Sequence, residues 1–208
     1  MYALVESGNI TRIFHNPQGF KLGDNQYSAD VFTKWSNSER EAIGIYAVTI
    51  DNSNKKNEKW YTNTNQTFTY DADAGTVTAS FGTATAKAHA DVNWTQSEID
   101  DGDAPEGTTT STVKTPGLKS KLIENIKKQA GGILSQTDWY VTRKSEKSTA
   151  IPSNISTHRD AVRTKQAEME TAITNAADTA ALETLYTYVE QEDGSLVRPL
   201  GELPELES

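Results

Sequence analysis

The chain has 208 residues, 35% of them hydrophobic, with no cysteine and a formal net charge of −9. The absence of cysteine excludes disulfides, thiolate catalysis and cysteine-ligated metal centres, and the negative charge opposes nonspecific nucleic-acid binding, which needs many Lys and Arg contacts to phosphates. Because no apolar run approaches the roughly 18 residues of a membrane span and the start lacks the basic and apolar regions of a signal peptide, we expect a protein of an aqueous compartment without membrane contact.

Residues 1–95 predict a small β-rich domain. β-prone or alternating runs face each other across short glycine-containing turns in three places: 2–6 with 10–14, 19–22 with 26–27, and 67–70 with 76–81. A further strand is expected at 45–50, and Ser36 or Ser38 is expected to cap one helical turn before Gly44. The core is predicted to consist of six aromatic residues: Trp35, Tyr46, Trp60, Tyr61, Phe68 and Phe81.

Residues 96–116 are acidic and rich in Thr, Gly and Pro, which predicts a linker that is disordered in isolation. The charge also changes along the chain. Residues 117–173 carry ten basic and six acidic residues, whereas 61–116 carry two and eight, and 174–208 carry one and eight. Either the acidic flanks fold back on the basic helical stretch, or copies of the chain meet through opposite charges. Contact with DNA inside a particle is a third explanation of the basic residues in 117–173.

Residues 117–190 predict a helical hairpin. Leu118, Leu122 and Ile126 recur every four residues, which places them on one stripe of a helix. This helix is expected to end at Gly131-Gly132, because glycine is unfavourable in a helix interior and common after a helix end.

Two further helices are predicted after this glycine pair. The first, 137–147, is expected to follow a Ser135 or Thr137 cap, and the longest helix is expected at 152–173. Along the longest helix, three apolar residues repeat every seven positions: Ile155, Val162 and Met169. Such a narrow seam suits an antiparallel partner helix. A short helix is expected at 180–186.

Residues 191–208 predict an extended acidic tail. Its leucines alternate with acids and prolines, at Leu196, Leu200, Leu203 and Leu206. Such a strip cannot fold alone and is expected to lie along another surface. The chain is therefore predicted to be α+β, with an N-terminal small β-rich domain followed by a C-terminal α-helical hairpin and an extended tail.

The stretch Leu134-Ser-Gln-Thr-Asp-Trp-Tyr140, followed by His158-Arg-Asp-Ala-Val-Arg163, resembles a helical hairpin common in phage tail-fibre assembly proteins and other tail-associated proteins. In those proteins a Leu-x-x-Thr-Asp-Trp segment precedes an amphipathic helix with a Tyr-Arg-x-x-(apolar)-Arg element. His158 stands here where tyrosine is usual, and the proline-rich end of that helix is absent. The resemblance implies a role in the virion or in its assembly.

The front half is similar to uncharacterised proteins of marine phages. This similarity rests on four segments: Tyr2–Glu6, Trp35-Ser36, Ala42–Tyr46 and Asn63–Phe68. It has no biochemical meaning of its own, but it implies the same virion context.

No residue pattern predicts catalysis or a metal site. The histidines lie in separate segments without the i,i+4 spacing of metal ligands: His15, His89 and His158. The acidic runs at 71–75 and 100–103 lack the glutamate that a calcium loop needs at its twelfth position, which falls on Gly82 or Ser111. We therefore expect no enzyme activity and no cofactor.

The start of the second predicted helix carries the residues of the resemblance. Thr137 is expected to cap the helix, Asp138 to favour its positive N-terminal end, and Trp139 to pack across the hairpin. Arg159 and Arg163 lie four residues apart on one helical face. They are expected to bind a carboxylate pair, a phosphate or, in preference, an acidic residue of the neighbouring helix, either Asp138 or Glu146.

These patterns are interpreted as a structural component of a bacteriophage virion, in the tail, the baseplate or the tail-fibre attachment. Its partners would be other phage structural proteins and copies of itself, bound through Leu118, Leu122, Ile126, Trp139, Ile155, Arg159, Val162, Arg163, Met169, Leu196, Leu200, Leu203 and Leu206. One alternative is a tail-fibre assembly chaperone that is absent from the mature particle. Another is a receptor- or glycan-binding module with Trp60 and Tyr61 as an exposed stacking surface.

Overall fold

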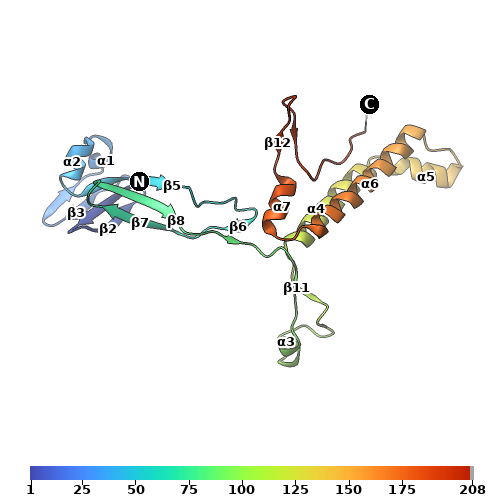
Figure 1. Cartoon of the computed structure of the whole chain (residues 1–208), viewed down its shortest axis with the longest axis horizontal. Helices are drawn as coiled ribbons and strands as arrows, with labels where there is room; N and C mark the ends of the chain where they lie inside the picture. The colour runs from blue at the N-terminus through green and yellow to red at the C-terminus, as the bar shows by residue number, and fades with distance from the viewer. Residues whose placement is uncertain (207–208) are drawn as a thin grey trace. The chain divides into compact units, whose positions relative to one another are not determined.

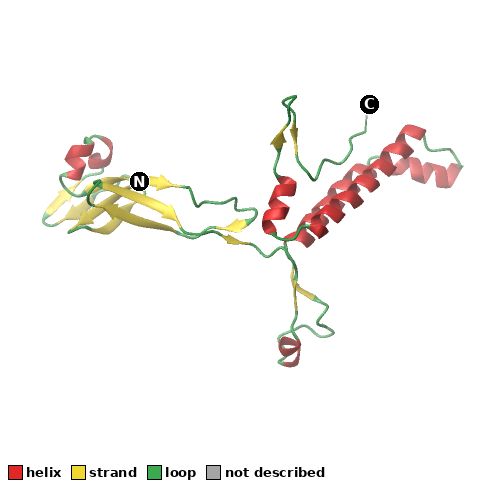
Figure 2. Cartoon of the chain, in the orientation of Figure 1, coloured by secondary structure: helices red, strands yellow, loops and turns green. Residues whose placement is uncertain are grey.

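The computed structural model describes residues 1–206, so the last two residues of the predicted tail, 207–208, lie outside the described residues. The chain divides into two compact units, Met1–Thr85 and Ala86–Ser208. Strands dominate the first unit and helices the second (Figure 1, Figure 2), which confirms the predicted α+β class. The division falls ten residues before the predicted boundary at residue 95, because residues 86–91 bond to helices of the second unit, as described below.

The first unit is built on a five-stranded sheet. Its elements are β1 (Tyr2–Glu6), β2 (Asn9–Phe14), β3 (Phe20–Leu22), β4 (Asn25–Tyr27), α1 (Asp30–Thr33), α2 (Asn37–Glu41), β5 (Ile45–Asp51), β6 (Tyr61–Thr62), β7 (Gln66–Asp71) and β8 (Thr76–Phe81), with β9 (Thr85–Ala86) at the division. The strand order is β2-β1-β5-β8-β7, and only the β5–β8 pairing within this sheet is parallel. All three predicted hairpins are confirmed, as β1–β2, β3–β4 and β7–β8.

The core of the first unit lies on both faces of the sheet, because successive residues of β1 point to opposite sides. On one side, an aromatic cluster fills the space under α1 and the β3–β4 hairpin: Leu4, Phe14, Phe20, Val31, Phe32 and Ile45. On the other side, Ala3, Val5 and Val77 are buried with Tyr46 and Tyr70 packed against them.

The predicted aromatic core is only partly right. Trp60 and Tyr61 are buried, but the other four predicted residues are half-buried. The main cluster is instead built around Phe14, whose ring centroid lies 5.0 Å from those of both Phe20 and Phe32. These three residues belong to separate elements, so their meeting depends on strand pairing that the sequence pattern does not display.

The predicted helical turn after Ser36 is confirmed as α2. The Ser36 side chain accepts a hydrogen bond from the backbone N–H of Glu39, and the Glu39 carboxylate accepts one from the backbone N–H of Ser36. This reciprocal capping box satisfies two amides at the helix start and holds the pKa of Glu39 below its usual value. The turn places Arg40 over the Tyr2 ring, where its guanidinium donates to the Trp35 carbonyl at 2.7 Å.

The second unit is built on an antiparallel pair of long helices. Its elements are β10 (Val92–Asn93), α3 (Gln96–Asp100), β11 (Val113–Thr115), α4 (Leu118–Ser135), α5 (Asp138–Lys147), α6 (Ser153–Asn175), α7 (Thr179–Tyr186), β12 (Val189–Glu190) and β13 (Leu196–Val197). Lys119, near the start of α4, donates to the carbonyl of Thr174, near the end of α6. At the other end of the pair, Arg159 of α6 donates to the carbonyl of Leu134. The helical hairpin is therefore closed by α4 and α6.

The predicted end of the first helix is wrong, because α4 continues through Gly131-Gly132 to Ser135. Two glycines cost about 2 kcal/mol of helix propensity relative to alanine. The helix persists because Ala130 is fully buried and Leu134 is half-buried on the stripe that Leu122 and Ile126 begin. Packing against α6 outweighs the local cost.

The segment before α4 ties its N-terminus to the rest of the unit. The Asp91 carboxylate accepts hydrogen bonds from the Gly117 amide and the Ser120 hydroxyl, both at 2.7 Å, which lowers the pKa of Asp91. The Ala88 carbonyl accepts from the Leu118 amide, and the Lys87 carbonyl from the Thr179 hydroxyl of α7. Asp91 thus acts as a cap supplied from outside the helix, and residues 86–91 belong to the second unit.

The predicted disordered linker instead has local structure. β10 and β11 pair antiparallel, and α3 between them begins with a capping box formed by Thr95 and Glu98. Glu98 also pairs with Lys114 of β11, and together these contacts lower the pKa of Glu98 to about 2. We call residues 92–115 the arm. Hydrogen bonds and one ion pair hold it, because none of its described residues is buried.

Gly131 and Gly117 form a matched pair for testing the α4 boundaries. A Cβ at Gly131 would meet no atom within 4 Å, so Gly131→Ala should stabilise the protein by about 0.5–1 kcal/mol through helix propensity. A Cβ at Gly117 would lie 2.3 Å from the Ala90 carbonyl oxygen, so Gly117→Ala should cost about 1–3 kcal/mol. Chemical denaturation of the full chain measures both, and a loss of stability in Gly131→Ala would contradict a helix that runs through this glycine.

The arm should lose its order in acid. A carboxyl whose folded-state pKa is depressed stabilises the folded form above its unfolded pKa, here 4.5, and ceases to do so as the pH falls through the folded value of about 2. Amide hydrogen exchange of residues 95–100 should therefore accelerate between these two pH values, after correction for the intrinsic pH dependence. In Glu98→Gln the exchange should already be fast at pH 7, and an unchanged rate in that variant would show that Glu98 does not hold the arm.

Candidate protein-binding surfaces

Four residues of the tail-protein resemblance meet at one buried guanidinium. Arg159 on α6 is 7% exposed, and its Nη1 donates to the Leu134 carbonyl and to the Thr137 hydroxyl, each at 2.7 Å. Its Nη2 donates to the Asp138 carboxylate at 2.8 Å. We call these four residues the Arg159 cluster. Because Leu134 lies in the last turn of α4 and Asp138 begins α5, the cluster fixes the corner where three helices meet.

The expected partner of Arg159 is confirmed, but two neighbouring expectations are wrong. The Thr137 hydroxyl donates to the Leu134 carbonyl and accepts from Arg159, so it makes no capping hydrogen bond to α5. Arg163 pairs with Asp160 on its own helix at 3.2 Å and is half exposed. The physical reason is that Arg159 lies on the face of α6 toward α4, whereas Arg163, one turn later, lies at the edge of that face.

Most of the apolar residues predicted to bind partners are already used within the chain. Five of them are buried between α4 and α6: Leu122, Ile126, Ile155, Val162 and Met169. Leu118 is half-buried. The prediction that these seams need another chain is therefore wrong for this fold, since α4 supplies the antiparallel partner helix that the α6 seam requires.

The predicted extended tail also folds on its own unit at first. β12 and β13 form a hairpin, and Leu200 beyond it is 2% exposed, with its amide donating to the Leu185 carbonyl of α7. Arg198 lies over the rings of Tyr186 and Tyr188, at 5.2 and 5.7 Å from their centroids. The burial of Leu200 contradicts its predicted role at a partner.

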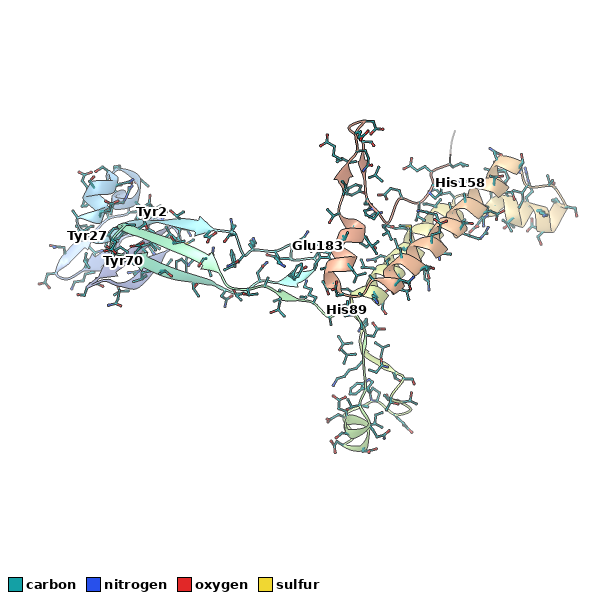
Figure 3. All side chains as sticks on the ribbon, in the orientation of Figure 1. Tyr2, Tyr27, Tyr70, His89, His158 and Glu183 are labelled. Atoms are coloured by element: carbon teal, nitrogen blue, oxygen red, sulfur yellow. The ribbon has the colours of Figure 1, made fainter. Side chains whose placement is uncertain are left out.

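The last described residues follow the α4–α6 pair without filling the surface beside them. One groove of about 900 Å³ lies between the tail and α4, and it is lined by Gln129, Gly132, Ile133, Gln136, Thr137, His158, Glu202, Leu203, Glu205 and Leu206. A second groove of about 490 Å³ lies on the α6 side of Pro204 and Leu206. His158, labelled in Figure 3, borders both grooves. Leu203 is half-buried and Leu206 is exposed, so both remain open to a partner.

The surface of α5 exposes an aromatic and basic group. Trp139 is 53% exposed, its ring centroid lies 3.9 Å from that of Tyr140, and the Arg143 guanidinium lies 4.7 Å over its ring. The expectation that Trp139 packs across the hairpin is therefore wrong. The buried seams of α4 and α6 cover each other, so they leave Trp139 on α5 exposed to solvent.

The β12–β13 hairpin carries a further exposed apolar group. Of its residues, the sequence patterns had identified only Leu196 as a binding residue. Four side chains at the base of the β12–β13 hairpin are about half exposed or more: Tyr188, Val189, Leu196 and Val197. Two short β-prone runs on either side of Asp193-Gly194 are a hairpin signal that could have identified it.

The acidic flanks do not neutralise the basic helices within residues 1–206. The ion pairs of the helices join neighbours on one helix or join α4, α5 and α6 to each other: Lys127–Glu170, Lys128–Glu124, Arg159–Asp138, Arg163–Asp160 and Lys165–Glu168. The carboxylates of the arm and of the β12–β13 turn take no part in them. Of the explanations for the charge distribution, the folding back of the acidic flanks is the one that these ion pairs argue against.

The exposed stacking surface predicted for the glycan-binding alternative is wrong. Trp60 is 3% and Tyr61 is 7% exposed, so neither presents a ring face for stacking on a sugar. In the part of the chain that the structure describes, no group of three or more His, Asp or Glu residues is arranged to hold a metal ion. None of the helices within residues 1–206 combines the length and the apolar character of a membrane span.

Comparison with known proteins does not add to this picture. No protein-family model, no curated protein and no solved structure matches the chain.

The Arg159 cluster yields a prediction about stability. Arg159→Met should cost about 2–4 kcal/mol, because it leaves a buried carbonyl and hydroxyl without their donor. Asp138→Asn should cost about 0.5–1 kcal/mol, since the Asp138 side chain is 59% exposed. Arg163→Met is the matched control, four residues along α6, and should change stability by less than about 0.5 kcal/mol. Equal losses in the two arginine variants, measured by urea denaturation, would contradict the special role of Arg159.

Proposed function

We propose that this protein is a non-enzymatic structural component of a bacteriophage virion, in the tail, the baseplate or the tail-fibre attachment. The observation that carries the proposal is the Arg159 cluster. Four positions of the tail-protein resemblance come together in one set of hydrogen bonds, since Arg159 lies 21 to 25 residues after Leu134, Thr137 and Asp138 and bonds to all three. Because these residues of the resemblance also contact each other, the contact supports a helical corner shared with tail proteins over a chance match of sequence.

The surfaces of the second unit support a role in protein–protein contact. Exposed apolar side chains are concentrated on two short elements, α5 and the β12–β13 hairpin. Such groupings on a protein surface mark interaction sites, whereas scattered single residues do not. The proposed function therefore operates through binding, with other phage structural proteins and copies of the chain as partners.

The tail favours a second candidate, a tail-fibre assembly chaperone. The tail segment 202–206 covers the α4–α6 pair while grooves stay open on both of its sides. A partner segment that fills these grooves better would displace the tail, and such exchange suits a protein that binds transiently and leaves before the particle is complete.

Particle proteomics separates the two candidates. If the proposal holds, purified virions of the phage encoding this chain should contain the protein at a constant ratio to a major tail protein. A chaperone should instead be abundant in infected cells and absent from purified virions, which would overturn the structural assignment.

A truncation tests the contribution of the tail to incorporation. A chain ending at Glu202 keeps the buried Leu200 and should stay folded, but the loss of Leu203 and Leu206 should lower its incorporation severalfold. The matched control is the full-length Glu205→Gln variant, which changes charge and keeps both leucines. Normal incorporation of the truncated chain would remove the tail from the proposed contacts.

A further inference from the structure

The α5 surface carries an arginine without an acidic partner. The Arg143 guanidinium lies over both rings, 4.7 Å from the centroid of Trp139 and 5.3 Å from that of Tyr140. Its Nε is buried and makes no hydrogen bond, and Arg143 forms no ion pair with any residue in 1–206. Trp, Tyr and Arg are the residues that dominate the energy of protein interfaces. Trp139, Tyr140 and Arg143 therefore fit a partner surface that contains a carboxylate and apolar side chains.

The β12–β13 hairpin has the complementary composition. Its ladder contains two residue pairs, Val189 with Val197 and Glu190 with Leu196, which is too little for independent stability in water. Leu196 is 65% exposed, the largest exposed fraction among the exposed large hydrophobic residues of the described chain. The turn is acidic and free of basic residues, with Glu190, Glu192 and Asp193. Glu190 and Glu192 form no ion pair within the described chain.

We propose that these two surfaces bind each other between copies of the chain, so that α5 of one copy receives the β12–β13 hairpin of the next. Charge complementarity identifies the occupant. α5 carries three basic residues, Arg143, Lys144 and Lys147, and two acidic ones, Glu146 and the Asp138 that pairs with Arg159, whereas the hairpin carries three acidic residues. The apolar hairpin residues would cover Trp139, and a hairpin carboxylate would pair with Arg143. This inference rests on the proposed function in that it names copies of the chain as the partner for the same surfaces.

The geometry of such a contact sets the kind of assembly. The two surfaces differ, so a contact through one pair of them is heterologous, and a bound pair of copies leaves one surface of each kind free. Heterologous contacts produce a closed ring or an open filament, whereas a symmetric dimer uses one surface twice. Both ring and filament suit a component of a phage tail. The ionic share of the contact should make the association weaker at high salt.

The test uses two full-length variants that each remove one surface. Trp139→Ala with Arg143→Glu alters α5, and Leu196→Ser with Glu192→Lys alters the hairpin. In analytical ultracentrifugation, the unaltered protein should form oligomers larger than a dimer as its concentration rises, and each variant alone should associate at least about tenfold more weakly. An equimolar mixture of the two variants should associate again, because the unaltered hairpin of one variant can bind the unaltered α5 of the other.

Controls separate lost contact from lost fold. Ile50→Ala, at a 49% exposed position of β5, should leave association unchanged. Both variants should keep the circular dichroism and melting temperature of the unaltered protein, and combining Arg143→Glu with Glu192→Lys in one chain should restore part of the association. A monomer at all concentrations, association that survives both variants, or a mixture that stays monomeric would overturn the proposal. If the unaltered protein is found in virions but does not self-associate, this pairing is rejected and the proposed function stands. If the protein self-associates as expected but is absent from virions, the proposed function is rejected and the pairing stands.

Discussion

The buried Arg159 guanidinium controls the arrangement of the second unit. It sits on α6, and it satisfies the last turn of α4 and the first turn of α5 at the same time. A charge removed from water is tolerated when each of its donors has a partner, and the planar fork of arginine can supply several at fixed angles. These bonds hold the corner between the three helices, and the next residue along α5, Trp139, is exposed beside it.

The limited apolar content of the chain is used mainly inside each unit. In the first unit, the aromatic cluster around Phe14 and the smaller residues on the other face of β1 fill both sides of the sheet. In the second, the seams of α4 and α6 cover each other, and Leu200 completes the packing beside α7. What remains exposed is concentrated at α5 and at the β12–β13 hairpin. A chain with these properties folds by itself and keeps separate surfaces for association.

Sequence patterns predicted the elements better than their ends or contacts. Hairpins with glycine turns, the Ser36 cap and the helical periodicities all appear where they were expected, because these features depend on residues close together in the chain. Gly131-Gly132 was expected to end a helix, and the linker was expected to be disordered. Both expectations were wrong for the same reason: the local cost was real, but contacts from elsewhere offset it, through α6 packing for the glycines and through Lys114 for α3.

The candidate site shows the same division between local and distant information. The sequence by itself determined the α+β class, the three hairpins of the first unit and the long helices of the second, since composition and short-range spacing govern these. Only the tertiary structure decided that the α4 and α6 seams satisfy each other, that Trp60 and Tyr61 are buried, and that Trp139 and Leu196 are exposed. Burial depends on which distant segments meet. A sequence pattern shows that an apolar face of a helix or strand will be covered, but it does not show which segment covers that face.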